Sequence, residues 1–324
     1  MSNPRIFGLV FFWIIFSCGK SKPVDKVDDS QSKPLYGIFQ SRLMSDYLVD
    51  GFVISKEKSG EITDQGDSLL FTGLTLGVLD CELIQGFLLA LDRMQDNFSG
   101  YLVRIDPLPE EFRQGDNFIS RDGATGALYG LQLAKRRCPA LSEKIVHILS
   151  RWKDAVGNSL VLYPKSLAGI ITPSFRTFWK VGHGVGISDV EYEEYIVSGL
   201  ATIALIKSQH SACYPIHLQT LQHLTFEIMG KPIFKRNKDE FCALTKGLGL
   251  LLTDWYCDRE SDAIKSWLSN PEQSKHVYEL QRCSWENGDA ANTLSPRVDF
   301  LVLFRHFTEG SSPLWHSELT TAKK

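Results

Sequence analysis

The chain has 324 residues, of which 43% are hydrophobic, and its formal net charge is only −3. This composition permits one large hydrophobic core. It argues against a nucleic-acid-binding protein, because the basic residues are dispersed and matched by acidic ones.

The N-terminus resembles that of an exported protein. Arg5 precedes an apolar run at residues 6–16, which is typical of a signal peptide and too short to span a bilayer. We therefore expect a signal peptide at residues 1–17. The run ends in Ile-Phe-Ser-Cys, which resembles a bacterial lipobox in which Cys18 takes a lipid; the alternative is ordinary secretion with cleavage nearby. Gly19, where inner-membrane lipoproteins of enterobacteria carry Asp, favours the outer membrane.

Residues 18–34 are polar and charged, with no apolar residue larger than Val after Cys18. Such a segment is expected to be a solvated tether between the lipid and the folded domain. Residues 35–324 are then one domain.

If Cys18 carries lipid, six cysteines remain, which permits three disulfides in an oxidising compartment. We expect Cys81 to pair with Cys138, because they lie on the two candidate hairpins nearest Arg121. No CxxC pair or His at zinc-like spacing is present, so no metal site and no cofactor are expected. The six are Cys81, Cys138, Cys213, Cys242, Cys257 and Cys283.

Helical patterns dominate the rest of the chain. Residues 66–97 have apolar residues on almost every side of a helix. This pattern predicts two helices of a buried hairpin, with the break near residues 80–82. Ser188 and Glu191 have the spacing of a capping box. Only residues 99–106 and 158–164 resemble strands. We predict an all-α fold, an α/α toroid of antiparallel hairpins, with an irregular helical bundle as the alternative. Further helices are expected within residues 117–134, 138–157, 187–210, 215–231, 238–258, 261–269 and 297–307.

Three long connections are expected between these helices, at residues 101–120, 157–187 and 285–296. Long connections in a compact domain usually serve function, and these are too aromatic for easy disorder. We expect them to gather on one face and build a site.

Three segments of the chain resemble a group of uncharacterised bacterial proteins with the α/α-toroid, or six-hairpin, fold. They are GDSLLFTGLTLGVL at residues 66–79, NFISRDGATGALYGLQLA at 117–134, and the connection at 163–186. In the wider superfamily such folds host glycosidases, unsaturated-uronide hydrolases and polysaccharide lyases. The resemblance implies a glycan cleft at one rim of the toroid.

Two carboxyl groups are the strongest candidates for chemistry. Asp67 and Asp122 each come at a predicted helix start, and glycoside cleavage requires two carboxyl groups on opposite sides of the bond. Ser68 and Thr72 would add hydroxyl contacts. The alternative is that both acids are helix caps.

Arg121 would hold an acidic sugar or keep a carboxylate ionised, or would only bridge two helix starts. Gly123, Gly126 and Gly130 follow it, either to let another helix or ligand approach or to hold the charges over a cleft.

A second group of candidates surrounds His183, which glycines flank on both sides. Its imidazole is a candidate acid or base, and a structural His is the alternative. Aromatic residues of the same connection would stack on sugar rings or form a core of their own, and basic residues would attract uronic acids. These binding candidates are Tyr163, Phe175, Phe178, Trp179, Lys165, Arg176, Lys180 and, nearer the C-terminus, Trp285, with Glu286 and Asp289 as reserve carboxylates.

The resulting hypothesis is a lipid-anchored envelope protein that hydrolyses acidic oligosaccharides or polysaccharides, with an anionic carbohydrate and the membrane as partners. One alternative is a noncatalytic lipoprotein that binds a glycan or an envelope protein. The other is a polysaccharide lyase, with His183 or Tyr163 as base and Arg121 as charge neutraliser.

Overall fold

The computed structural model describes residues 29–54, 56–57, 59–60, 68–103, 119–164, 169–207, 213–248, 250–259, 261–269, 293–294 and 298–308. Within these ranges the chain forms twelve α-helices, one short 3-10 helix (η3, Pro139–Leu141) and four two-residue strands. The prediction of an all-α fold is confirmed.

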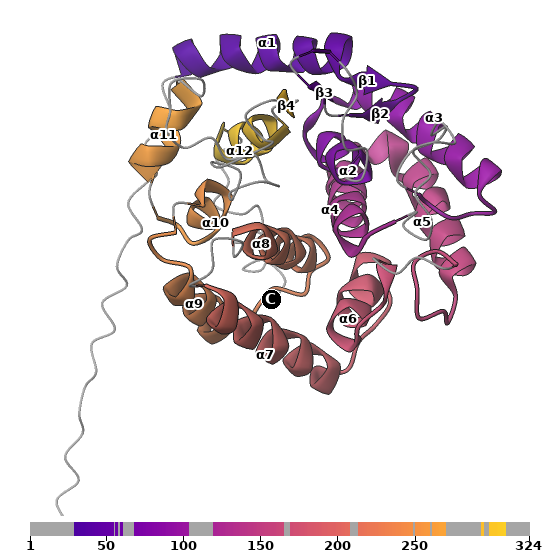
Figure 1. Ribbon diagram of the computed structural model, residues 1–324, viewed down its shortest axis with the longest axis vertical. Coiled ribbons are helices and arrows are strands. Elements are labelled where there is room, and N and C mark those ends of the chain that lie inside the picture. The colour runs from indigo at the N-terminus through magenta and orange to yellow at the C-terminus, as the bar shows by residue number, and fades with distance from the viewer. Residues whose placement is uncertain are drawn as a thin grey trace, which may run out of the picture.

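Outer helices alternate along the chain with helices nearer the centre (Figure 1). The outer helices are α1 (Asp29–Asp46), α3 (Cys81–Asn97), α5 (Ser142–Val156), α7 (Asp189–Ile206), α9 (Lys235–Leu244) and α11 (Ser261–Ser269). The inner ones are α2 (Ser68–Val78), α4 (Arg121–Arg137), α8 (Cys213–Ile228), α10 (Leu251–Tyr256) and α12 (Val298–Thr308). Helix α6 (Pro173–Gly182) packs against α4, α7 and α8.

The inner helices make a closed series of contacts: α2 packs on α4, α4 on α8, α8 on α10, α10 on α12, and α12 again on α2. Helices α2 and α4 run in the same direction, since Leu69 lies beside Gly123 near their starts and Gly77 beside Gly130 further along. Helix α12 also runs this way, because Arg305 in its last turn donates to the carbonyl of Val78 at the end of α2.

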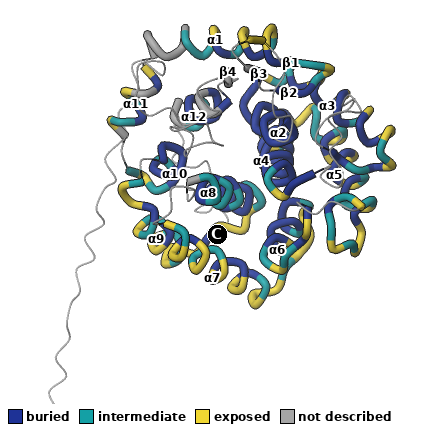
Figure 2. Tube along the Cα trace, in the orientation of Figure 1, coloured by how far each residue is buried: buried dark blue, intermediate teal, exposed yellow. Residues whose placement is uncertain are grey.

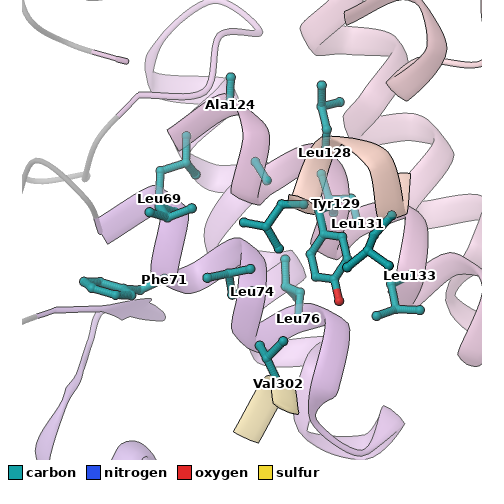
Figure 3. Packing of buried hydrophobic residues seen from close by; sticks show 14 of the residues in the cluster. Leu69, Phe71, Leu74, Leu76, Ala124, Leu128, Tyr129, Leu131, Leu133 and Val302 are labelled. Carbon is teal, nitrogen blue, oxygen red and sulfur yellow. The ribbon is translucent and has the colours of Figure 1, made fainter. Parts of the chain in front are cut away.

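The contact between α2 and α4 explains the glycines of the Ser-Arg-Asp-Gly stretch. A Cβ atom at Gly130 would lie 1.6 Å from the carbonyl oxygen of Gly73, and one at Gly126 would lie 2.7 Å from that of Leu70. Every residue of α2 is buried, and apolar side chains of α2 and α4 gather in the same part of the core (Figure 3). The packing interpretation of Gly126 and Gly130 is therefore confirmed.

The carboxyl ends of α2 and α4 are tied together. Cys81 and Cys138 form the predicted disulfide. Arg137 donates to the carbonyl oxygens of Gly77 and Leu79 at 2.7 and 3.2 Å, which satisfies acceptors that a helix end leaves open. Arg305 adds an ion pair with Asp80. We call this region the stapled end.

The disulfide and Arg121 lie at opposite ends of α4. Cys138 follows the last residue of α4 and Arg121 is its first, so the two are a whole helix apart. A second disulfide, between Cys242 and Cys257, joins α9 to the end of α10. Cys18 and Cys283 lie outside the described residues.

The strands are short connectors. Strands β1 (Leu48–Val49) and β2 (Phe52–Val53) form an antiparallel hairpin, turned by Asp50 and Gly51 at positive φ. Strand β3 (Lys56–Glu57) pairs antiparallel with β4 (Thr293–Leu294), which joins distant parts of the chain. The described residues of the two predicted strands, 99–103 and 158–164, form no regular strand. Their one β contact is an isolated bridge from Val161 to Ile170, which lies outside both predicted strands.

The helix boundaries differ from the expected ones in three places. Helix α1 begins at Asp29, inside the predicted tether. Helix α6 lies within the predicted loop at residues 157–187, where Thr172 caps its start and Pro173 takes the first helical position. Residues 238–258 are divided between α9 and α10, with Gly247 at a φ of +79° between them.

Candidate functional site at the loop end

The starts of α2, α4 and α12 lie opposite the stapled end, in a region that we call the loop end. The long connections enter here, because residues 98–120 lead into α4 and residues 157–172 lead into α6. The connections that leave α2 and α4 at the stapled end are short by comparison. Loops held by a rigid scaffold are the usual carriers of function, so the loop end is the candidate site.

Asp122 lies in the first turn of α4 and is not its cap. Ser120 is the cap, since its Oγ accepts from the backbone nitrogen of Gly123 at 3.1 Å. The half-buried carboxylate of Asp122 instead accepts a hydrogen bond at Oδ2 from the hydroxyl of Tyr214, in the first turn of α8. A carboxylate is favoured at this position by the helix dipole. The capping interpretation of Asp122 is therefore wrong.

Arg121 is exposed, and no ion pair to its side chain is found in the described part of the chain. Asp67, its expected neighbour, lies outside the described residues and adjoins Ser68, the first residue of α2. Thr72 does not face the site, because its Oγ1 accepts from the backbone nitrogen of Val53 at 2.9 Å. Ser68 is buried.

A polar network continues below Asp122 between α4, α7 and α8. Gln222 donates to Thr125 at 3.3 Å and accepts from the hydroxyl of Tyr195 at 3.0 Å. Gln219 donates to the same hydroxyl at 2.7 Å and lies 3.0 Å from Nε2 of His223. Tyr195 and His223 are buried, so these bonds hold α8 at a fixed rotation against α4.

Sequence reasoning missed Tyr214, Gln222 and Tyr195. Gln219, Gln222 and His223 are spaced so that they share one face of a helix, and that polar face was the available signal. Tyr214 had no such signal, because its partner is 92 residues away in the chain.

His183 is not brought to Asp122. It follows the last residue of α6, where the carbonyl of Gly182 accepts from Gln132 at 2.6 Å, and Gln132 lies about 15 Å along α4 from Asp122 at 1.5 Å per residue. Its ring packs against Trp179 and Trp152, with centroids 4.1 and 5.6 Å away.

Burial, reinforced by the charge of Lys153, lowers the pKa of His183 to about 3. Neither ring nitrogen makes a hydrogen bond of good geometry in the described part of the chain, and the backbone of Leu149 only partly opposes the fall in pKa. This environment favours a neutral, structural imidazole.

The predicted sugar-stacking residues are mostly packed on other aromatic rings. Trp179 is buried against Trp152, and Phe175 and Phe178 belong to the core. Tyr163 is half-buried against Tyr101, with ring centroids 5.1 Å apart.

The basic candidates differ in their availability to a ligand. Lys180 forms an ion pair with Glu191, whereas Arg176 is exposed. Lys165, Trp285, Glu286 and Asp289 lie outside the described residues.

In the described ranges, no group of three His, Cys, Asp or Glu side chains is arranged to hold a metal ion. No helix in those ranges is both long and apolar enough to span a bilayer. Comparison of the chain with protein-family models, with curated proteins and with solved structures gave no match.

Proposed function

We propose that this chain is a lipid-anchored protein of the bacterial envelope, in which an α/α toroid carries a glycan site at its loop end. The proposed activity is hydrolysis of acidic oligosaccharides or polysaccharides. Cys18 would hold the lipid, and the loop end would meet the glycan.

The toroid proposal is supported by three features of the helices. Outer and inner helices alternate along the chain, α2, α4 and α12 run the same way, and α12 packs on α2. A ring of helical hairpins, in which the last hairpin packs on the first, would have these features. An irregular bundle has no reason to repeat the alternation.

The observation that carries the proposed activity is the hydrogen bond between Asp122 and Tyr214. It joins the first turns of two inner helices and fixes the direction of a carboxylate at the end where the long connections enter. An oriented carboxylate suits a general base or nucleophile in glycoside hydrolysis, which needs a second carboxyl group about 5 to 10 Å away. We assign the second role to Asp67 and the recognition of acidic sugars to the exposed Arg121.

Noncatalytic glycan binding is the second candidate, because the hydroxyl of Tyr214 already engages one oxygen of Asp122. A carboxylate held in this way also suits hydrogen bonds to sugar hydroxyls. A lyase that uses His183 has less support, since that imidazole lies deep against two tryptophans.

The experiment is a screen of the full chain against neutral and uronate-containing oligosaccharides, with measurement of binding and of new reducing ends. We expect Asp122→Asn to lower turnover at least about 100-fold, the usual contribution of a general acid or base. Tyr214→Phe should lower turnover less, and Arg121→Ala should weaken acidic ligands more than neutral ones.

Glu143→Gln is the matched control, because Glu143 is an exposed acid in the first turn of another helix, α5. Turnover should be unchanged in that variant. Binding without turnover that Asp122→Asn abolishes would favour the second candidate. If Asp122→Asn left a glycan's turnover and affinity intact, both candidates would be wrong.

A further inference from the structure

Helix α7 presents an apolar stripe to solvent on the outside of the molecule. No charged residue lies between Glu194 and Lys207. Val190, Val197 and Leu205 are 65%, 64% and 76% exposed, and among the other large apolar side chains described only Leu160 is as exposed. Figure 2 shows exposed residues along the outer side of α7.

These side chains share one face of the helix. At 100° per residue, Val190, Val197, Ala201, Ala204 and Leu205 fall within an arc of about 100°. The exposed Glu194 falls within the same arc, so the stripe carries no charge only from Val197 to Leu205. Ala201 and Ala204 are exposed like the others. The buried side of α7 is also apolar and packs on α6, α8 and α9. From Tyr195 to Ile206 the helix has no charged residue on any side. A helix that is apolar all round is normally covered on every side, so the outer stripe of this part suits a partner.

We propose that α7 packs against α7 of a second copy of this chain, antiparallel and about a twofold axis near residue 200. The small side chains of Ser198, Ala201 and Ala204 would let the two helix axes approach to about 8 Å. A twofold contact is self-complementary, so one apolar stripe supplies both sides of it.

The charges at the two ends of α7 favour this occupant and this direction. Glu193 lies seven residues before position 200 and Lys207 lies seven residues after it. Both lie on the same side of the stripe, at about −60° and −100° from Val190 at 100° per residue. Antiparallel pairing therefore sets Glu193 of each copy against Lys207 of the other. A parallel pair would place like charges together, and an anionic lipid surface would be repelled by Glu193 and Glu194.

The contact is tested by cysteine cross-linking of the full chain in mild detergent. A Cα atom sits about 2.3 Å from its helix axis, so two copies of position 201 would lie within the reach of a disulfide, about 7 Å. We expect Ala201→Cys to form a disulfide-linked dimer on oxidation. Leu89→Cys is the matched control, since Leu89 is 54% exposed on α3, and it should stay monomeric on the same gel.

Sedimentation of the same material provides an independent measurement. The wild type should sediment as a dimer and Val197→Asp as a monomer. Glu193→Lys should weaken the dimer about two- to tenfold, as expected for two exposed ion pairs, and adding Lys207→Glu should restore it. Restoration would support this register, because a merely damaged helix would not recover.

The proposal is overturned if the wild type is monomeric and Ala201→Cys does not cross-link. It is also overturned if the double charge reversal fails to restore a dimer that Glu193→Lys weakens. A monomer whose α7 amides gain protection from hydrogen exchange only on phosphatidylglycerol vesicles would assign the stripe to lipid instead.

Discussion

Two glycines inside helices have opposite surroundings, although the sequence does not distinguish them. A Cβ atom at Gly130 in α4 would strike the carbonyl oxygen of Gly73, whereas one at Gly86 in α3 would meet nothing within 4 Å. Gly130 is therefore required by the close approach of two backbones. Gly86 only weakens its helix.

We predict that Gly130→Ala lowers the free energy of unfolding by about 3 kcal/mol or more, because α2 and α4 must separate. Gly86→Ala, the matched control, should raise it by about 1 kcal/mol through better helix propensity. Urea unfolding followed by circular dichroism measures both changes. Equal effects of the two substitutions would contradict the account of the α2–α4 contact.

At the scale of elements, the two described disulfides close chain segments of different length. Cys81 and Cys138 are 57 residues apart, and Cys242 and Cys257 are 15 apart. In the chain-entropy model, a disulfide stabilises the fold by restricting the unfolded chain, and the longer closed loop contributes more.

We predict that replacing both Cys81 and Cys138 by Ser costs about 4 kcal/mol, and that replacing both Cys242 and Cys257 costs about 3 kcal/mol. Each pair is changed together so that no unpaired thiol remains. Calorimetric unfolding of the two double variants gives the comparison. A larger loss from the shorter loop would show that local packing, not chain entropy, sets the difference.

The sequence predicted those helices whose ends depend on local chemistry. Ser188 and Glu191 form the expected capping box, and Gly157 ends α5 as expected, at a φ of +52°. Helix α6 was missed because its aromatic residues and Pro173 suggested a loop. The pair Thr172 and Pro173 was in fact a helix start.

The candidate site was only half predictable. Asp122 could be identified from the sequence because it stands at a helix start in an unusual Ser-Arg-Asp-Gly stretch. Its hydrogen bond to Tyr214 could not, since it depends on how α8 packs against α4. The pairing of Cys81 with Cys138 was predicted and is confirmed.

At the scale of the whole molecule, several histidines are held neutral by the fold. Burial lowers the pKa of His217 to about 4 and that of His223 to about 3, the latter with help from Lys238. Burial and the charge of Arg137 lower the pKa of His306 to about 3. Together with His183, which follows α6, they place histidines that resist protonation in three parts of the fold, at the end of α6, in α8 and in α12.

The pH dependence of stability follows from these values. An unfolded histidine has a pKa of about 6.5, so the unfolded chain takes up protons first as the pH falls. The buried, neutral histidines make their full contribution to the free energy of unfolding above about pH 6.5. As the pH falls toward 4, each contribution declines by up to about 1.4 kcal/mol per pH unit.

We predict that His217→Leu reduces this decline, because neither nitrogen of His217 has a hydrogen-bond partner in the described part of the chain. At pH 7 the substitution should be neutral or stabilising. Val146→Thr, at an exposed position on α5 with no titratable side chain, is the control and should leave the pH dependence unchanged. Urea midpoints at pH 7 and pH 5 test this, and a wild type with equal midpoints would contradict it.

The difference between the two ends of the inner helices determines where the chain can change in length. At the stapled end only residues 79–80 connect α2 to α3, and the helix ends are fixed by a disulfide and two arginines. A residue inserted there would strain these contacts, or would shift α3 by one residue and turn its buried face by about 100°. At the other end, added residues cost only loop entropy, which grows slowly with length. Descendants of this chain can therefore acquire a new recognition surface by insertion at one end while the other end preserves the fold.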